Sequence, residues 1–164
     1  MNKKTIEKIF ESAIWHITKY ANREDYEKGK SYERIRFEEN ELTNEGINEL
    51  TTVLGSEASG VKFDNANANL IVGTGVGAAA PADTEATFTA GVKAGMMVGY
   101  PTYGTDQGIT WKAAFTELVA NQAWQEFGVL NADTAGKLLN RKVEDQGTKV
   151  EGQIWELELQ MTFA

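Results

Sequence analysis

The strongest constraint on the fold is the strict alternation of residues 155–163. The odd-numbered positions are apolar and the positions between them are polar. The apolar set is Trp155, Leu157, Leu159, Met161 and Phe163. Because successive side chains of a β-strand point to opposite faces, this segment predicts a strand with one face in a core and one in water. Residues 109–116 alternate in the same way and predict a second half-buried strand.

Further strands are expected along the chain, separated by turn signals. They are a β-hairpin of residues 13–21 with 31–40, a short buried strand at 69–72, and strands at 124–130 and 136–143. For residues 85–100 the sequence does not decide between a strand and irregular structure. Six to eight strands of this kind predict a mainly β protein, an antiparallel β-sandwich of jelly-roll-like type with one or two short helices.

One helix is expected at the start of the chain. Within residues 3–11, Ile6, Ile9 and Phe10 stand at helical spacing. Residues 1–12 are therefore interpreted as an N-terminal helical segment, and residues 13–164 as a single β-sandwich domain.

A second helix is predicted at residues 44–54. Thr43 is suited to cap its N-terminus, Glu45 lies in the first turn, and Gly55 provides a stop. An apolar stripe runs along it, formed by Ile47, Leu50, Val53 and Leu54.

Composition narrows the possible functions. The 164 residues contain 24 acidic and 16 basic side chains, for a net charge of −8, with one histidine and no cysteine. A thiolate metal site and a cysteine nucleophile are thereby excluded. The acidic balance argues against a nucleic-acid partner. The sequence has no run of 18 apolar residues, so a membrane partner is not expected, and the early acid at Glu7 argues against a signal peptide.

Two motifs resemble ligand sites and are interpreted as turns. Residues 70–78 read as a strand followed by G-x-G-x-x-A, the dinucleotide-binding pattern, but Pro81 and further glycines follow where that pattern requires a helix. Residues 64–69 alternate side-chain oxygens as a calcium loop does, yet lack its glycine and its bidentate glutamate. Asn and Asp are common in turns. We expect no cofactor and no metal.

The remaining candidate catalytic and ligand-binding residues are better explained by structural roles. His16 lies between Trp15 and Ile17 and is expected to be a packed or half-exposed strand residue. A solvated acidic face accounts for the carboxylates Glu38, Glu39, Glu41, Glu45 and Glu49. Core packing is favoured over a sugar-stacking platform for Trp111, Trp124 and Trp155. The residues therefore do not predict an enzyme.

A resemblance supplements this interpretation. After the hairpin come L-T-N-E-G at 42–46, V-G-T-G at 72–75 and A-P-A-D-T at 80–84. W-K-A-A-F follows at 111–115, A-N-Q-A-W-Q-E-F-G-V at 120–129, and L-L-N-R-K-V at 138–143. The order is similar to a group of tailed-bacteriophage virion proteins, and the likeness covers residues 13–163.

The resemblance implies a non-enzymatic structural protein of the virus particle. The expected function is capsid decoration: binding to the outer surface of the head and stabilising its lattice. Its partners would be the major capsid protein and further copies of itself, with a trimer as one arrangement. It would be made in the cytoplasm of a bacterial host and located on the capsid surface. A tail-fibre or baseplate component and a carbohydrate-binding β-sandwich remain the alternatives.

Two regions are expected to contribute to docking. One is the N-terminal stripe of Ile6, Ile9 and Phe10, although an apolar stripe at a chain end can instead cover its own domain. The other is the Gly- and Ala-rich region from Ala78 to Tyr103, where Ala78, Pro81, Tyr100 and Tyr103 are the candidate contact residues.

Overall fold

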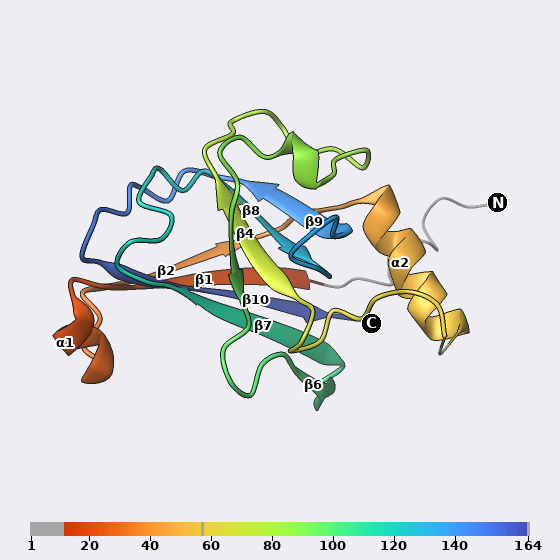
Figure 1. Ribbon diagram of the computed structural model, residues 1–164, viewed down its shortest axis with the longest axis horizontal. Helices are drawn as coiled ribbons and strands as arrows, with labels where there is room; N and C mark the ends of the chain where they lie inside the picture. The colour runs from red at the N-terminus through yellow and green to blue at the C-terminus, as the bar shows by residue number, and fades with distance from the viewer. Residues whose placement is uncertain (1–11, 57, 164) are drawn as a thin grey trace.

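The computed structural model describes residues 12–56 and 58–163, which form two antiparallel five-stranded sheets (Figure 1). The first, called the β1 sheet, has the order β2 (Glu33–Glu38), β1 (Ser12–Tyr20), β10 (Ile154–Thr162), β7 (Gly108–Phe115), β6 (Thr102–Thr105). The second, the β8 sheet, has the order β3 (Glu41–Leu42), β9 (Leu138–Val143), β8 (Glu126–Leu130), β4 (Asn69–Gly73), β5 (Val92–Gly95). The predicted antiparallel β-sandwich is confirmed.

Aromatic side chains fill the space between the two sheets. The tryptophans are all buried, with exposed fractions of 0% for Trp15 and Trp124, 1% for Trp111 and 2% for Trp155. The Trp124 ring meets Trp155 edge-on, with 5.0 Å between centroids. The indole N–H of Trp111 donates to the carbonyl of Phe63 at 2.9 Å. The core position expected for Trp111, Trp124 and Trp155 is confirmed, so they form no exposed sugar platform.

The predicted β-hairpin is confirmed as β1 and β2, which pair from Ile14–Glu38 to Lys19–Glu33. A short helix that was not expected, α1 (Arg23–Glu27), lies in the connection between the two strands. The Asn22 side chain caps it by accepting the N–H of Asp25 at 2.9 Å. Ser12 already belongs to β1, so the expected helical segment cannot extend to residue 12.

Helix α2 (Asn44–Gly55) confirms the second predicted helix and its Thr43 cap. Its apolar stripe is only partly covered. Leu50 packs against the core, whereas Ile47 is 39% and Leu54 87% exposed. The helix therefore presents part of its apolar face to a surface groove.

Several boundaries differ from the sequence-based expectation. Strand β8 begins at Glu126 rather than at 124, and β9 at Leu138 rather than at 136. The open segment 85–100 forms one 3₁₀ turn, Glu85–Thr87, and strand β5. Strands β3 and β6 were not expected, because two and four residues are too few to show alternation.

Candidate interaction surfaces

The glycine-rich motif after β4 surrounds an internal carboxylate. Glu126 on β8 is fully buried, and its Oε1 accepts the backbone N–H groups of Gly75 at 2.8 Å and Thr89 at 2.7 Å. A Cβ on Gly75 would lie 2.6 Å from both carboxylate oxygens, and one on Gly73 would also collide with Oε1. The interpretation of 70–78 as a glycine-lined turn is supported, since the glycines admit Glu126.

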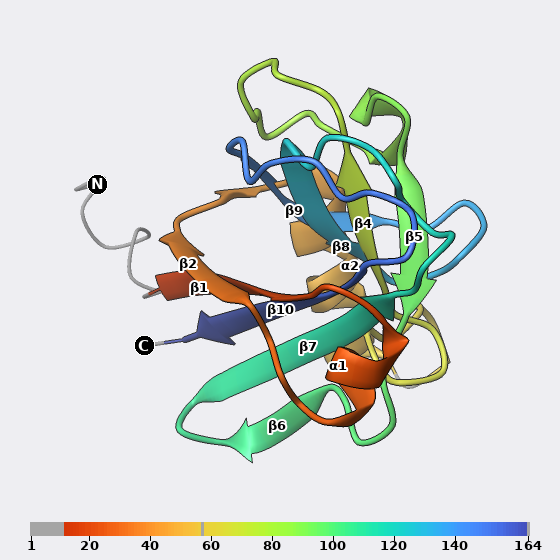
Figure 2. The ribbon, with the colours of Figure 1, turned by 90° about the vertical axis from the view of Figure 1, so that its left-hand side faces the viewer.

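Arg141 on β9 completes this network. Its guanidinium donates to Oε2 of Glu126 from Nε at 3.1 Å and from Nη2 at 2.6 Å. Its Nη1 donates to Oδ2 of Asp83 at 2.9 Å and to the carbonyl of Ala78 at 3.4 Å. A buried arginine thus fixes the long loop between β4 and β5 against the outer face of the β8 sheet (Figure 2).

The L-T-N-E-G motif fixes the start of α2 to the same sheet. Thr43 Oγ1 accepts the N–H of Gly46 at 3.1 Å and donates to the carbonyl of Leu138. A Cβ on Gly46 would collide with the backbone of Leu139. The backbone N–H of Asn44 donates to the carbonyl of Pro81 at 2.7 Å. The helix and the β4–β5 loop are therefore joined to each other as well as to β9.

The expected docking residues fall into separate places. Ile6, Ile9 and Phe10 lie outside the described residues. Ala78 and Pro81 are exposed, but their carbonyls anchor the β4–β5 loop, at the top of Figures 1 and 2. Tyr100 and Tyr103 line one small hollow beside β6. Strand β6 itself lies at the bottom of the same views. The four described candidates, all from the second expected region, thus lie in two separate places.

The hollow beside β6 is shaped by an asparagine. Asn65 Nδ2 donates to the carbonyls of Met97 at 3.1 Å and Tyr100 at 2.5 Å, which holds the loop before β6. Asp64 Oδ1 accepts the N–H and the Nδ2 of Asn67, the turn expected for residues 64–69. Beside this hollow Tyr103 is 73% exposed and Val98 is 99% exposed. Large apolar groups therefore project into solvent here.

An apolar groove runs between α2 and the β1 sheet. Its volume is about 510 Å³. Leu50 and Val53 form the helix side, and Tyr103 and Ile109 belong to the opposite side. Its full lining is Leu50, Val53, Lys62, Phe63, Asp64, Pro101, Tyr103, Ile109, Trp111, Leu139 and Phe163. The composition suits an apolar protein segment better than a polar small molecule.

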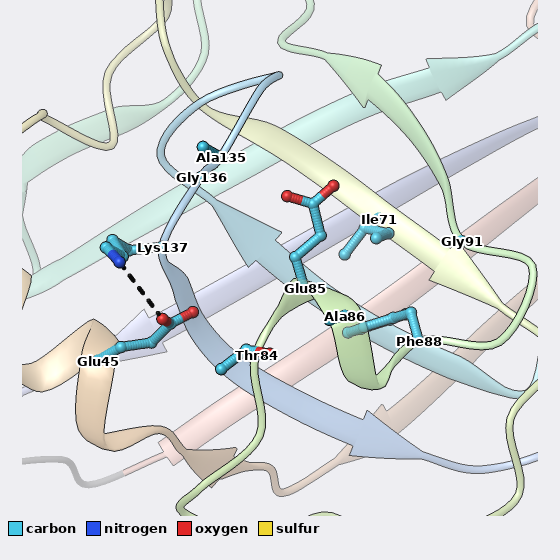
Figure 3. Close-up of a pocket in the computed structure, with 10 residues that line it drawn as sticks. All are labelled: Glu45, Ile71, Thr84, Glu85, Ala86, Phe88, Gly91, Ala135, Gly136 and Lys137. Atoms are coloured by element: carbon cyan, nitrogen blue, oxygen red, sulfur yellow. Dashed lines mark ion pairs between the residues drawn. The ribbon is translucent and has the colours of Figure 1, made fainter.

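A second hollow lies on the outer side of the β8 sheet and has a charged rim (Figure 3). Its volume is about 530 Å³, and Ile71 and Phe88 contribute apolar surface. Glu45 on α2 faces Lys137, with 3.7 Å between carboxylate and ammonium. Glu45 also accepts the N–H of Leu138 at 2.8 Å. Glu49 accepts from Val61 and Asn131, so these two glutamates belong to contacts rather than to a freely solvated face.

Polar side chains on the outer face of the β1 sheet form a ladder. Lys112 Nζ lies 3.0 Å from Glu156, which is only 6% exposed, although the alternation predicted a solvated position. His16 lies 3.4 Å from Glu158, as a half-buried strand residue. Burial, and then the charge of Arg34, lowers the pKa of His16 despite the Glu158 carboxylate. The surroundings of His16 therefore favour its neutral form.

A buried lysine joins two loops at the other end of the core. Lys149 has an exposed fraction of 0%, and its Nζ donates to the carbonyl of Thr116 and to Oδ1 of Asn121, both at 2.7 Å. Burial lowers the pKa of Lys149 to about 8, opposed by the charge of Glu117. A neutral amine still has two N–H groups, so both hydrogen bonds survive deprotonation.

The fold and these surfaces define an antiparallel β-sandwich with a buried ionic network and an apolar groove. Among residues 12–56 and 58–163, His, Asp and Glu side chains form no group of three suited to a metal ion. Neither α1 nor α2 is long and apolar enough to span a membrane. Comparison of the chain with protein-family models, curated proteins and solved structures gives no match.

Proposed function

We propose that the chain is a non-enzymatic structural protein of a tailed-bacteriophage particle, a capsid decoration protein on the outer surface of the head. One observation carries the proposal. Residues from four motifs of the resemblance meet in one buried network: Gly75, Asp83, Glu126 and Arg141. Motifs that interlock in this way define a fold, which supports a shared architecture with the group they resemble.

The docking surface in this proposal lies beside β6. Val98 and Tyr103 project there, and Tyr100 lines the adjoining hollow. Aromatic side chains that are exposed before assembly and covered afterwards contribute strongly to protein–protein contacts. The partner is the major capsid protein, or a further copy of this chain at a lattice three-fold axis. Binding to the assembled lattice alone would oppose its disassembly.

The first test is the number of copies per particle. Quantitative mass spectrometry of purified virions would compare this chain with the major capsid protein. A count in the hundreds that scales with the lattice supports decoration. A handful of copies would move the assignment to the tail fibre or baseplate, and complete absence would reject a virion role.

A second test addresses the surface itself. Heads that lack the chain would be mixed with purified Tyr103→Asp and Leu118→Asp variants. Tyr103 is 73% and Leu118 is 76% exposed, so the two changes are matched in exposure. Tyr103→Asp is expected to weaken head binding at least tenfold, and Leu118→Asp to leave it unchanged. Equal binding of both variants would remove β6 from the interface.

A further inference from the structure

The described part of the chain begins beside the apolar groove. Ser12 pairs with Thr162 at the end of β10, and Thr162 pairs with Gly108 at the start of β7. The residues that follow on these two strands, Phe163 and Ile109, line the groove. Since neighbouring strands are about 5 Å apart, residue 12 lies roughly one strand spacing from the nearest groove wall.

The groove has an apolar character that matches the segment before Ser12. Its helix side is formed by Leu50 and Val53, which face Trp111 and Ile109 of the β1 sheet across the opening. An opening of this kind between a helix and a sheet accepts the apolar face of an amphipathic helix. Tyr103, which also lines the groove, is strongly exposed and adds apolar surface at its edge.

The eleven residues before Ser12 carry a suitable stripe. Ile6, Ile9 and Phe10 follow the i, i+3, i+4 spacing of one helical face. They stand two to six residues before Ser12. Even fully extended, six residues span only about 20 Å, so the stripe stays within reach of the groove.

We propose that Ile6, Ile9 and Phe10 pack into the groove of their own subunit. The covalent link to β1 places the stripe beside the groove at an effective concentration in the millimolar range. A segment from a second copy has to compete with that concentration. This proposal does not depend on the virion assignment. If it holds, the stripe is occupied within its own subunit, and docking falls to the surface beside β6.

Cross-linking tests the occupant directly, because the chain has no natural cysteine. One variant carries Ile9→Cys with Val53→Cys, a groove position. The matched control carries Ile9→Cys with Val150→Cys, which is 53% exposed and precedes β10 at the end opposite Thr162. A short bismaleimide would be added to dilute protein, and the products measured by intact mass and peptide mapping.

The expected product is an internally cross-linked monomer for the Val53 pair, at least tenfold more abundant than for the Val150 pair. A cross-linked dimer would show that a second copy supplies the stripe and would overturn the proposal. Equal yields from both pairs, or no product from either, would overturn it as well.

A thermal measurement gives an independent readout. Phe10→Asp is expected to lower the melting temperature by several degrees and to increase binding of an apolar dye. Lys8→Asp, on the opposite helical face, is expected to change neither. If the two variants melt and bind dye alike, the groove is not covered by this stripe.

Discussion

Arg141 donates two hydrogen bonds to Glu126, at 3.1 Å and 2.6 Å, and neither side chain is more than 3% exposed. The pair lies on the face of the β8 sheet that points away from the aromatic core. Desolvation makes each charge costly unless the other is present. The β4–β5 loop supplies the cover and the additional hydrogen bonds, so loop and ion pair depend on each other.

Replacement of Arg141 should therefore strongly destabilise the folded protein. Arg141→Met is expected to lower the free energy of unfolding by about 3–5 kcal/mol, since Glu126 keeps a buried charge without its partner. Urea denaturation measures the difference. Lys142→Met, which removes only a partly exposed pair with Glu144, is expected to stay within about 0.5 kcal/mol. Similar losses for both would contradict a buried network.

Two glycines that follow β4, Gly75 and Gly77, allow a matched pair of alanine substitutions. Gly75→Ala places a methyl group 2.6 Å from both oxygens of Glu126, so the free energy of unfolding is expected to fall by about 1–3 kcal/mol. Gly77→Ala meets no described atom within 4 Å and is expected to be nearly neutral. Chemical denaturation of the two variants is the measurement. A neutral Gly75→Ala would mean that the loop can move away from Glu126.

In helix α2, the usual stabilising effect of a glycine-to-alanine substitution is expected to be reversed at Gly46. Alanine in place of a helical glycine ordinarily stabilises a protein by about 0.5–1 kcal/mol. Gly46→Ala is expected to destabilise instead, by about 2 kcal/mol, because its methyl group meets the Leu139 backbone. Gly55→Ala, with open space among the described atoms, provides the comparison in thermal melts. Stabilisation by both changes would contradict the close helix–strand contact.

The lowered pKa of Lys149 predicts that the free energy of unfolding rises with pH. Its pKa is about 8 in the folded protein and 10.5 in the reference state, so between these values the unfolded chain binds more protons. The free energy of unfolding should increase by about 2 kcal/mol from pH 7.5 to pH 9.5. Lys149→Met should lose this slope, whereas Lys30→Met, an exposed position, should retain it. Urea titrations across that range are the check, and parallel slopes in all three proteins would reject the assignment.

The sequence allowed the long strands and α2 to be predicted, because their periodicity extends over many residues. It could not reveal the Glu126–Arg141 network. Polar residues on a strand are expected to face water, and here they are covered by the β4–β5 loop, whose Gly75 lies 51 residues before Glu126. The G-T-G motif at residues 73–75 can be recognised in the sequence. The carboxylate for which its glycines leave space, that of Glu126, comes from the distant strand β8. The short helix α1 did leave one signal, Asn22 three residues before Asp25.

The attachment of α2 has a consequence for backbone exchange with solvent. Thr43, Glu45 and Gly46 join the first turn to β9, whereas Leu54 in the last turn is 87% exposed. A helix fastened at one end frays from the other. Deuterium uptake along α2 should therefore be graded, slow at Ile47 and fast beyond Thr52. The side of the groove formed by Val53 can then open while the network at Arg141 stays closed.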